Sequence, residues 1–286
     1  MVDAVRVVPT LATKSRRPCF REMSMNAKIN AIAATILMLA APVVPAAAYA
    51  QCRATSPDFT IALIELYTSE GCDSCPPADR WFSKMALGPT TARSATLAFH
   101  VDYWDRLGWR DRFGNSAFTA RQHEEVQRQR GGFAYTPQVL IAGRDFPPWR
   151  EPAQPEAAIA AANARPPKAT IELSAQTRGA RAAEVELSVR VPEARDRANA
   201  RVHVALVQSA LVSDVGAGEN AGKRLSHDHV VREWRAGLKP DAKGEVREHV
   251  SFALPADTGP LAIVAFAENA ATGDVLQALT LPLCAP

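Results

Sequence analysis

The stretch FTIALIELYTSEGCDSCPP, residues 59–77, joins a strand pattern to a helix start across two cysteines. Its first part, 59–67, is an almost continuous apolar run with β-branched side chains, which is typical of a strand buried on both faces. The segment 73–87 has helical spacing, and its two prolines are tolerated because they fall in the first turn. The pattern therefore places Cys72 and Cys75 at a turn between a buried strand and a helix.

Cys72 and Cys75 form a C-x-x-C pair, which suits either half of a zinc site or a redox-active dithiol. A zinc site needs a second pair of ligands at a suitable spacing. The other cysteines lie near the chain ends, and the histidines form no matching cluster apart from His227-x-His229, far along the chain. A redox dithiol needs a helix start, whose amide hydrogens and dipole stabilise the thiolate. We therefore expect a redox pair that works without a cofactor.

Composition and charge set limits on the class of protein. The chain has 286 residues, enough for one large domain or two ordinary ones. With 47% hydrophobic and 22% charged residues it has the composition of a globular protein. The net charge of +3 is small and the Lys and Arg residues are scattered, so we expect no nucleic-acid partner.

Residues 1–50 predict a leader with a cleaved signal peptide. Lys28 precedes the apolar run 29–41, and the small-x-small motif AYA at 48–50 offers a cleavage site. The run is too short for a comfortable membrane span. We expect a periplasmic or secreted protein that is free of the membrane after cleavage. An uncleaved N-terminal anchor is the alternative.

The cysteine count supports an oxidising compartment. Once the leader is removed, four cysteines remain, and an even number outside the cytosol suggests two disulfides. Cys72 and Cys75 are a local pair. Cys52 and Cys284 lie at the two ends of the mature chain, so a structural disulfide between them would tie the ends together.

The remaining sequence predicts two parts of different character. Residues 51–165 combine further buried strands with helices, expected at 95–103, 116–130, 138–141 and 156–164. Residues 166–286 show short alternating strands between turn residues, expected at 170–174, 183–190, 202–207, 246–252 and 261–268, with a last one near 279. The second part is therefore predicted as a smaller all-β, sandwich-like domain. A β-rich extension of one continuous fold is the alternative.

Residues 59–164 resemble the thioredoxin superfamily. The resemblance rests on Cys72-x-x-Cys75 between strand and helix, and on Thr136-Pro137 entering a later strand. It implies an α/β thioredoxin-like domain ahead of the all-β one. It also implies that Pro137 is cis and shapes a substrate groove beside the cysteines, with the Thr136 backbone pairing with a client peptide. A trans proline in a plain loop is the alternative.

The same resemblance suggests a role for Glu65. Thioredoxins carry a buried acid on the strand that leads to the cysteines, where it relays a proton, and Glu65 lies in that strand. A carboxyl in an apolar strand should have a raised pKa and could take the proton from Cys75. The alternative is a Glu65 side chain that turns outward at a strand edge.

Several segments are similar to a secreted family listed as domain of unknown function 1223. They are ELYTSEGC at 65–72, HVDYWD at 100–105, TPQ at 136–138, GEN at 218–220 and HVVR at 229–232. This resemblance covers nearly the whole mature chain and implies a thioredoxin-like domain with an appended β domain. It implies no particular substrate.

Two acidic residues flank the first cysteine. Glu70 and Asp73 place negative charge beside Cys72, which raises a thiol pKa and works against the helix dipole. We therefore expect a weakly activated thiol, with a pKa above about 5, and a reduction potential nearer the reducing end of the range.

An aromatic loop, 104–118, follows the second buried strand. Its first residue, Trp104, is a candidate for binding a client, although such loops more often cover a core. His100 ends that strand near the cysteines and could serve as a copper ligand, since thiolates and imidazole suit copper. A core or loop role for His100 is the alternative.

These observations favour a thiol–disulfide oxidoreductase with a protein client and a redox partner. Cys72 would exchange with the client, Cys75 would resolve the mixed disulfide, and Pro137 would hold the partner strand. Two alternatives stay open. One is a metal-handling protein that binds a copper ion, and the other is a binding module in which the Cys72–Cys75 bridge is only structural.

Overall fold

The computed structural model describes residues 51–179 and 181–284. The predicted leader, 1–50, lies outside the described residues. Among the helices of the described part, none is long and apolar enough to cross a membrane.

The described elements are mostly strands. The helices are α1 (Pro76–Leu87), α2 (Ser116–Arg128), α3 (Gln154–Asn163) and the single turn α4 (Ala194–Arg197). The strands are β1 (Gln51–Thr55), β2 (Ala62–Thr68), β3 (Ser94–His100), β4 (Gln138–Ile141), β5 (Arg144–Asp145), β6 (Thr170–Arg178), β7 (Ala182–Arg190), β8 (Ala200–Gln208), β9 (Leu211–Asp214), β10 (Arg224–His227), β11 (Val230–Leu238), β12 (Glu245–Ala253), β13 (Leu261–Asn269) and β14 (Val275–Pro282).

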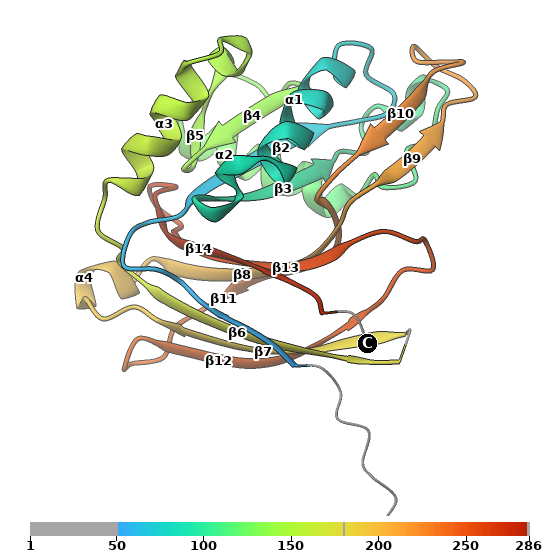
Figure 1. Ribbon diagram of the computed structural model, residues 1–286. Coiled ribbons are helices and arrows are strands. Elements are labelled where there is room, and N and C mark those ends of the chain that lie inside the picture. Colours follow the sequence, from blue (N-terminus) through green and yellow to red (C-terminus); the bar gives the residue numbers. More distant parts are fainter. Residues whose placement is uncertain (1–50, 180, 285–286) are drawn as a thin grey trace, which may run out of the picture. The chain divides into compact units, whose positions relative to one another are not determined.

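The strands form three sheets (Figure 1). The largest has the order β14-β13-β8-β11-β3-β2-β4-β5, and a four-stranded sheet has the order β1-β6-β7-β12. Strands β9 and β10 make a two-stranded hairpin of their own. Within the large sheet, β11 and β3 run parallel and pair at Val230 and Ala98, which joins its two halves.

The half of the large sheet made of β3, β2 and β4 is buried on both faces. On one face Ile64 of β2 packs with Phe82 of α1 and Ile159 of α3. On the other face Leu63 and Tyr67 join a core shared with β8, β13 and α2. Burial on both faces explains why β2 is apolar almost throughout.

The other half, β14, β13, β8 and β11, lies between two cores. Phe266 of β13 faces the core that is shared with β2. Ile263 of the same strand lies on the opposite face and packs with Leu173 and Leu187 of the four-stranded sheet. The layers therefore run from α1 and α3 through the two halves of the large sheet to the four-stranded sheet (Figure 1).

The expected α/β thioredoxin-like domain followed by a smaller all-β sandwich-like domain is wrong as a fold class. Strand β1 pairs with β6, and β11 pairs with β3, so sheets combine strands from both sides of residue 165. The strand pattern shows which faces are buried, but it carries no information on which distant strand supplies the pairing edge. The boundary at residue 165 stays a prediction about folding units.

Two local differences have clear causes. Helix α1 begins at Pro76 rather than at residue 73, because prolines occupy its first two positions and Cys75 is its N-cap. Strands β9, β10 and β11 were not expected. The first two have only four residues each, and β11 is polar over much of its length.

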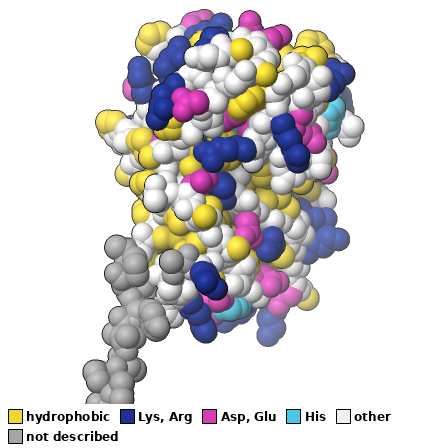
Figure 2. Space-filling view, turned by 90° about the vertical axis from the view of Figure 1, so that its right-hand side faces the viewer, with side chains coloured by type: hydrophobic (Ala, Val, Ile, Leu, Met, Phe, Trp, Pro, Cys, Tyr) yellow, Lys and Arg dark blue, Asp and Glu magenta, His cyan; other side chains and the backbone are white. Residues whose placement is uncertain are grey.

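The charged side chains on the face drawn in Figure 2 are of both signs and are interspersed. This mixture agrees with the small net charge of +3. It is the pattern of an ordinary solvated surface.

Candidate active site

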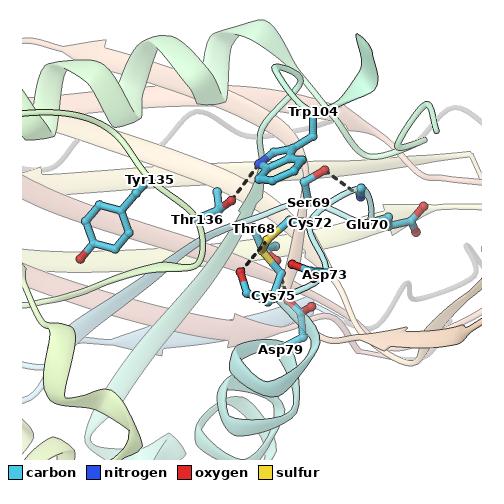
Figure 3. Close-up of a disulfide and its surroundings, with 12 residues drawn as sticks. Thr68, Ser69, Glu70, Cys72, Asp73, Cys75, Asp79, Trp104, Tyr135 and Thr136 are labelled. Carbon is cyan, nitrogen blue, oxygen red and sulfur yellow. Dashed lines mark hydrogen bonds between the residues drawn. A yellow bond between two sulfur atoms is a disulfide. The ribbon is translucent and has the colours of Figure 1, made fainter. Parts of the chain in front are cut away.

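The Cys72–Cys75 pair lies in a tight turn between β2 and α1, as the sequence predicted. The Cys72 amide donates to the Ser69 carbonyl (3.2 Å), and the Cys75 amide donates to the Cys72 carbonyl (3.2 Å). These turns bring the two Cα atoms to 5.4 Å, and the cysteines form a disulfide (Figure 3). The predicted local disulfide is confirmed.

Both cysteines are fully buried. Cys72 and Cys75 are each 0% exposed. The Ser74 Oγ lies 3.4 Å from the Cys72 sulfur. Any exchange reaction at this disulfide therefore requires the covering residues to move.

Trp104 and Thr136 lie beside the cysteine turn (Figure 3). The Trp104 indole Nε1 donates to the Thr136 Oγ1 (2.8 Å). A Cβ atom at Gly71 would lie 3.1 Å from the Trp104 Cβ, so glycine permits this close approach. The Thr136-Pro137 peptide is cis, which confirms that expectation. The structure thus brings the predicted cysteines, Trp104 and Thr136 to one place.

The aromatic loop has two functions in the fold. Phe113 and Phe118 are buried in cores, in agreement with the alternative that the loop covers a core. Trp104 and Trp109 are only half-buried: Trp104 approaches Gly71 of the cysteine turn, and Trp109 donates to Glu70. Beside the loop, a cleft of about 670 Å³ is lined by Tyr103, among others, and by Phe133, whose side chain is 76% exposed.

A cluster of buried polar side chains packs under the turn. His100 Nδ1 lies 2.7 Å from Asp111 Oδ2, and that same oxygen accepts from the Glu70 amide (2.9 Å). His227 from β10 stacks edge-on against His100, with ring centroids 4.8 Å apart, and its Nε2 lies 3.4 Å from Glu70 Oε1. Trp109 Nε1 donates to the other Glu70 oxygen (2.8 Å).

The charges of this cluster stabilise one another. Burial raises the pKa of Asp111, but the adjacent His100 outweighs it and the net result is a pKa lowered from 3.8 to about 2. Burial lowers the pKa of His100, but the Asp111 carboxylate reverses this and the pKa is raised. For Glu70, burial raises the pKa, but the polar groups around the carboxylate, with His227 first among them, together outweigh burial, and the net result is a lowered pKa. The Glu70 carboxylate, whose charge we expected to act on Cys72, is therefore engaged by His227 and Trp109.

Asp79 is a buried carboxyl that the sequence interpretation missed. It lies one helical turn after Cys75, and the Thr68 Oγ1 donates to its Oδ1 (2.9 Å) (Figure 3). Burial raises its pKa, opposed by His227 and His100. The spacing of four residues from Cys75 places both on one helix face, and this was a signal available in the sequence.

Glu65 lies away from the cysteines. It is on the β2 face opposite α1, where Arg121 Nη2 is 2.8 Å from its Oε1. Arg121 also reaches Glu268 (3.1 Å) and Glu125 (3.3 Å). Glu65 is buried, which rules out the outward orientation. Because its carboxylate is paired with Arg121, we propose no proton relay through it.

The pKa values of this second cluster shift in different directions. Burial raises the pKa of Glu65, against the opposing effect of Arg121. Burial also raises the pKa of Glu125, to about 7, again opposed by Arg121. For Glu268 the attraction of Arg121 and the contact with His203, whose Nε2 lies 3.3 Å from Oε1, exceed the effect of burial, and the pKa is lowered.

The connection between β9 and β10 completes the cysteine turn. The Asn220 Nδ2 donates to the carbonyls of Glu70 and Cys72, both at 2.8 Å. The Glu219 Oε2 accepts from the Asp73 amide (3.2 Å). These contacts span about 150 positions of sequence, so no local pattern could have revealed them.

The copper alternative can be compared with the geometry. His100 is engaged by Asp111 through Nδ1. Across residues 51–179 and 181–284, no three His, Cys, Asp or Glu side chains are arranged to hold a metal ion.

The second predicted disulfide is also confirmed. Cys52 of β1 and Cys284, just after β14, are bonded with their Cα atoms 5.8 Å apart. Cys52 is 7% exposed and belongs to the core between the four-stranded sheet and the large sheet. Two disulfides in one chain indicate an oxidising, extracytosolic environment.

Comparison with known proteins supports one relationship at the level of family. A crystal structure of a protein from Agrobacterium tumefaciens matches this chain with 25% identity and a TM-score of 0.54. The match covers 79% of this chain and 96% of the Agrobacterium chain. HBP35 of Porphyromonas gingivalis matches over 79% of this chain and 76% of its own, with 15% identity and a TM-score of 0.56, which shows similarity of fold alone. No curated protein matches the chain.

The family described as protein of unknown function (DUF1223) matches residues 63–267. This match covers most of the chain, including the cysteine turn, the cis Thr136-Pro137 peptide and the Asn220 contacts. The chain therefore belongs to the DUF1223 family.

Proposed function

We propose that the protein is a thiol–disulfide oxidoreductase that exchanges disulfides with protein clients. The observation that carries this proposal is the Cys72–Cys75 disulfide in the turn between a buried strand and α1, with Cys75 as the helix N-cap. A helix N-terminus stabilises a thiolate, which is the reactive species in exchange. The neighbouring Trp104 and Thr136 support a client-binding surface beside the pair.

The exchange proceeds in two balanced steps. A client thiolate attacks the Cys72 sulfur and forms a client–Cys72 disulfide, while the Cys72–Cys75 bond breaks and Cys75 leaves as a thiolate that takes a proton from water. A second client thiolate then attacks the client sulfur, and Cys72 leaves and is protonated. The client dithiol is oxidised, the enzyme disulfide is reduced, and a redox partner with the opposite exchange restores it. The same steps in reverse reduce a client disulfide.

Trapping of the intermediate tests this proposal. In Cys75→Ser the resolving thiol is absent, so the Cys72 thiolate should attack a disulfide-bonded peptide, release one peptide thiol and keep the other in a mixed disulfide that accumulates and is visible by mass spectrometry of the intact protein. Cys72→Ser should form much less of it. Ser74→Ala, which changes the residue between them and keeps both sulfurs, should resolve the adduct as the wild type does. Equal adduct on Cys72→Ser and Cys75→Ser would contradict the assigned roles.

The proposal also includes where the protein acts and how it is related to the thioredoxin superfamily. We propose export through a cleaved signal peptide in residues 1–50 to a periplasmic or extracellular site, in keeping with the two disulfides. The relation to the thioredoxin superfamily is proposed only for the local arrangement of Cys72-x-x-Cys75 and the cis Pro137.

A second candidate function is favoured by one observation. Cys72 and Cys75 are 0% exposed, as expected of a bridge that only holds a turn in a binding module. Such a bridge resists mild reductant, whereas a catalytic one is reduced readily. Titration with dithiothreitol under native conditions, followed by thiol counting, separates the two functions.

A further inference from the structure

The burial of the disulfide conflicts with its use, and the conflict points to the residues that cover it. An attacking sulfur must reach the Cys72 sulfur directly, yet Cys72 is 0% exposed. The connection between β9 and β10, residues 215–223, lies against the cysteine turn through Asn220 and Glu219.

Asn220 is placed to act as a latch, which here means a side chain that holds the connection against the cysteine turn. Most residues of the connection are exposed, but Asn220 is 0% exposed because its side chain is inserted against the turn. Its amide group donates to the carbonyls on both sides of Gly71, those of Glu70 and Cys72. Its Oδ1 accepts from the Lys223 Nζ (2.7 Å) within the connection itself. One side chain therefore supplies two hydrogen bonds between the connection and the redox turn.

The connection makes further contacts with the turn and with the aromatic loop. Glu219 accepts from the Asp73 amide at an exposed site. Gly218 lies against the Trp109 side chain, where a Cβ atom would come within 3.1 Å of the Trp109 Cβ, and its φ of +73° also favours glycine. These contacts attach the connection to the turn and to the aromatic loop at the same time.

The hairpin that bears the connection is a separate element of the fold. Its two strands pair with each other and form a sheet separate from the two larger ones. It projects from between β8 and β11 beside α1 (Figure 1). At its base Leu211 packs with Phe113 and Val230, which fixes that end. At the same end His227 of β10 stacks on His100. The opposite end, which is the connection, is held by Asn220, Glu219 and the packing of Gly218 on Trp109.

We propose that the connection between β9 and β10 is a cover of the redox site and that Asn220 is its latch, whose release admits a protein thiol to Cys72. This inference rests on the proposed oxidoreductase function. It makes Asn220 a positioning residue that also sets specificity, because a protein thiol needs a wider opening than a small reductant does.

Rates of reduction test the cover. The disulfide of wild type and of Asn220→Ala is reduced once with dithiothreitol and once with a reduced dithiol protein, thioredoxin, and thiols are counted over time. Loss of two buried hydrogen bonds should raise the open population about ten-fold or more. We expect the rate with the protein reductant to rise by about that factor and the rate with dithiothreitol to rise less.

Matched variants distinguish a latch from a general loss of stability. Arg224→Ala removes an exposed pair with Asp214 on the same hairpin, without contact to Asn220, and should stay within about two-fold of wild type. Glu219→Ala removes the other contact with the turn and should change the rates in the same direction as Asn220→Ala, by a smaller factor. It serves as the test if Asn220→Ala does not fold, as judged by circular dichroism.

The outcomes separate the two proposals. A reducible disulfide whose rates are unchanged in Asn220→Ala, or in Glu219→Ala where that serves as the test, overturns the cover and leaves the oxidoreductase intact. Equal acceleration with both reductants overturns the role in specificity. A disulfide that neither reductant opens in any variant overturns the oxidoreductase function and the cover together.

Discussion

Asp111 connects the cysteine turn to the buried histidines. One of its oxygens contacts His100 and the Glu70 amide, while the other accepts from the Phe113 amide. It lies in the loop after β3, which the sequence analysis treated only as an aromatic loop. Its function depends on groups supplied by β3 and by the turn after β2, and spacing along the chain does not indicate them.

Replacement of Asp111 by Asn should destabilise the protein, most strongly at neutral pH. The folded pKa of Asp111 is lowered from 3.8 to about 2, so its charge stabilises the fold above pH 3.8, and this contribution disappears as the pH falls to about 2. The contribution is on the order of 2 kcal/mol. Urea unfolding from pH 2 to 7 should show a difference between wild type and variant that shrinks toward pH 2.

His100 should add a second pH dependence to the free energy of unfolding, above pH 6.5. Because its folded pKa is raised above 6.5, its charged form stabilises the fold below that pH, and the gain is lost as the pH rises through the folded pKa.

The control for Asp111→Asn is Asp214→Asn, which breaks a mostly exposed pair with Arg224 and should change stability little. A constant difference at all pH values would refute the assigned ionisation of Asp111.

Single residues also show what the sequence could and could not predict. The C-x-x-C pair and the proline of Thr136-Pro137 are recognisable because their meaning is local. Glu65 was recognised as a buried acid, but its partner Arg121 lies on α2, 56 positions away. The even–odd alternation along β2 places Glu65 with Leu63 and Tyr67, on the face away from α1, and this was the available signal against a relay.

At the scale of elements, α2 joins the two halves of the large sheet through one cation. Arg121 is buried, contacts Glu65 of β2 and Glu268 of β13, and lies over the Phe266 ring at 5.2 Å from its centroid. The helix itself was predictable from its spacing. Its partner across the core was not, because β13 follows it by more than 130 residues.

Removal of this cation should be costly. In Arg121→Met three buried carboxylates lose their common partner, and we expect a loss of about 3–5 kcal/mol in the free energy of unfolding. Arg247→Met, at an exposed pair with Glu245, is the matched control and should change little. Adding Glu268→Gln to Arg121→Met should recover part of the loss in denaturant titrations. No loss in Arg121→Met would show that the cluster does not support the fold.

The whole molecule depends on pairings between distant segments. Strand β1 reaches β6, and the chain end returns to β1 through Cys52–Cys284. The sequence indicated most strands of the second part and both disulfides. It could not indicate that the strands of the two parts share a sheet, because apolar alternation specifies a buried face and leaves the neighbour open.

The terminal disulfide should act on stability and leave the redox site unchanged. It closes a loop of 232 positions, so Cys52→Ala with Cys284→Ala should lower the free energy of unfolding by about 2–5 kcal/mol. The rate of exchange at Cys72, measured below the melting temperature of the variant, should match the wild type. Altered exchange in a folded variant would contradict the separation of the two bridges.

The reduction potential of Cys72–Cys75 tests the central claim most directly. It is measured by equilibrating the native protein in glutathione or dithiothreitol redox buffers and counting the Cys72 and Cys75 thiols by mass spectrometry. The account predicts a reversible transition toward the reducing end of the catalytic range, between about −200 and −270 mV. A bridge that stays oxidised below about −300 mV is structural, and this result would contradict the proposed oxidoreductase.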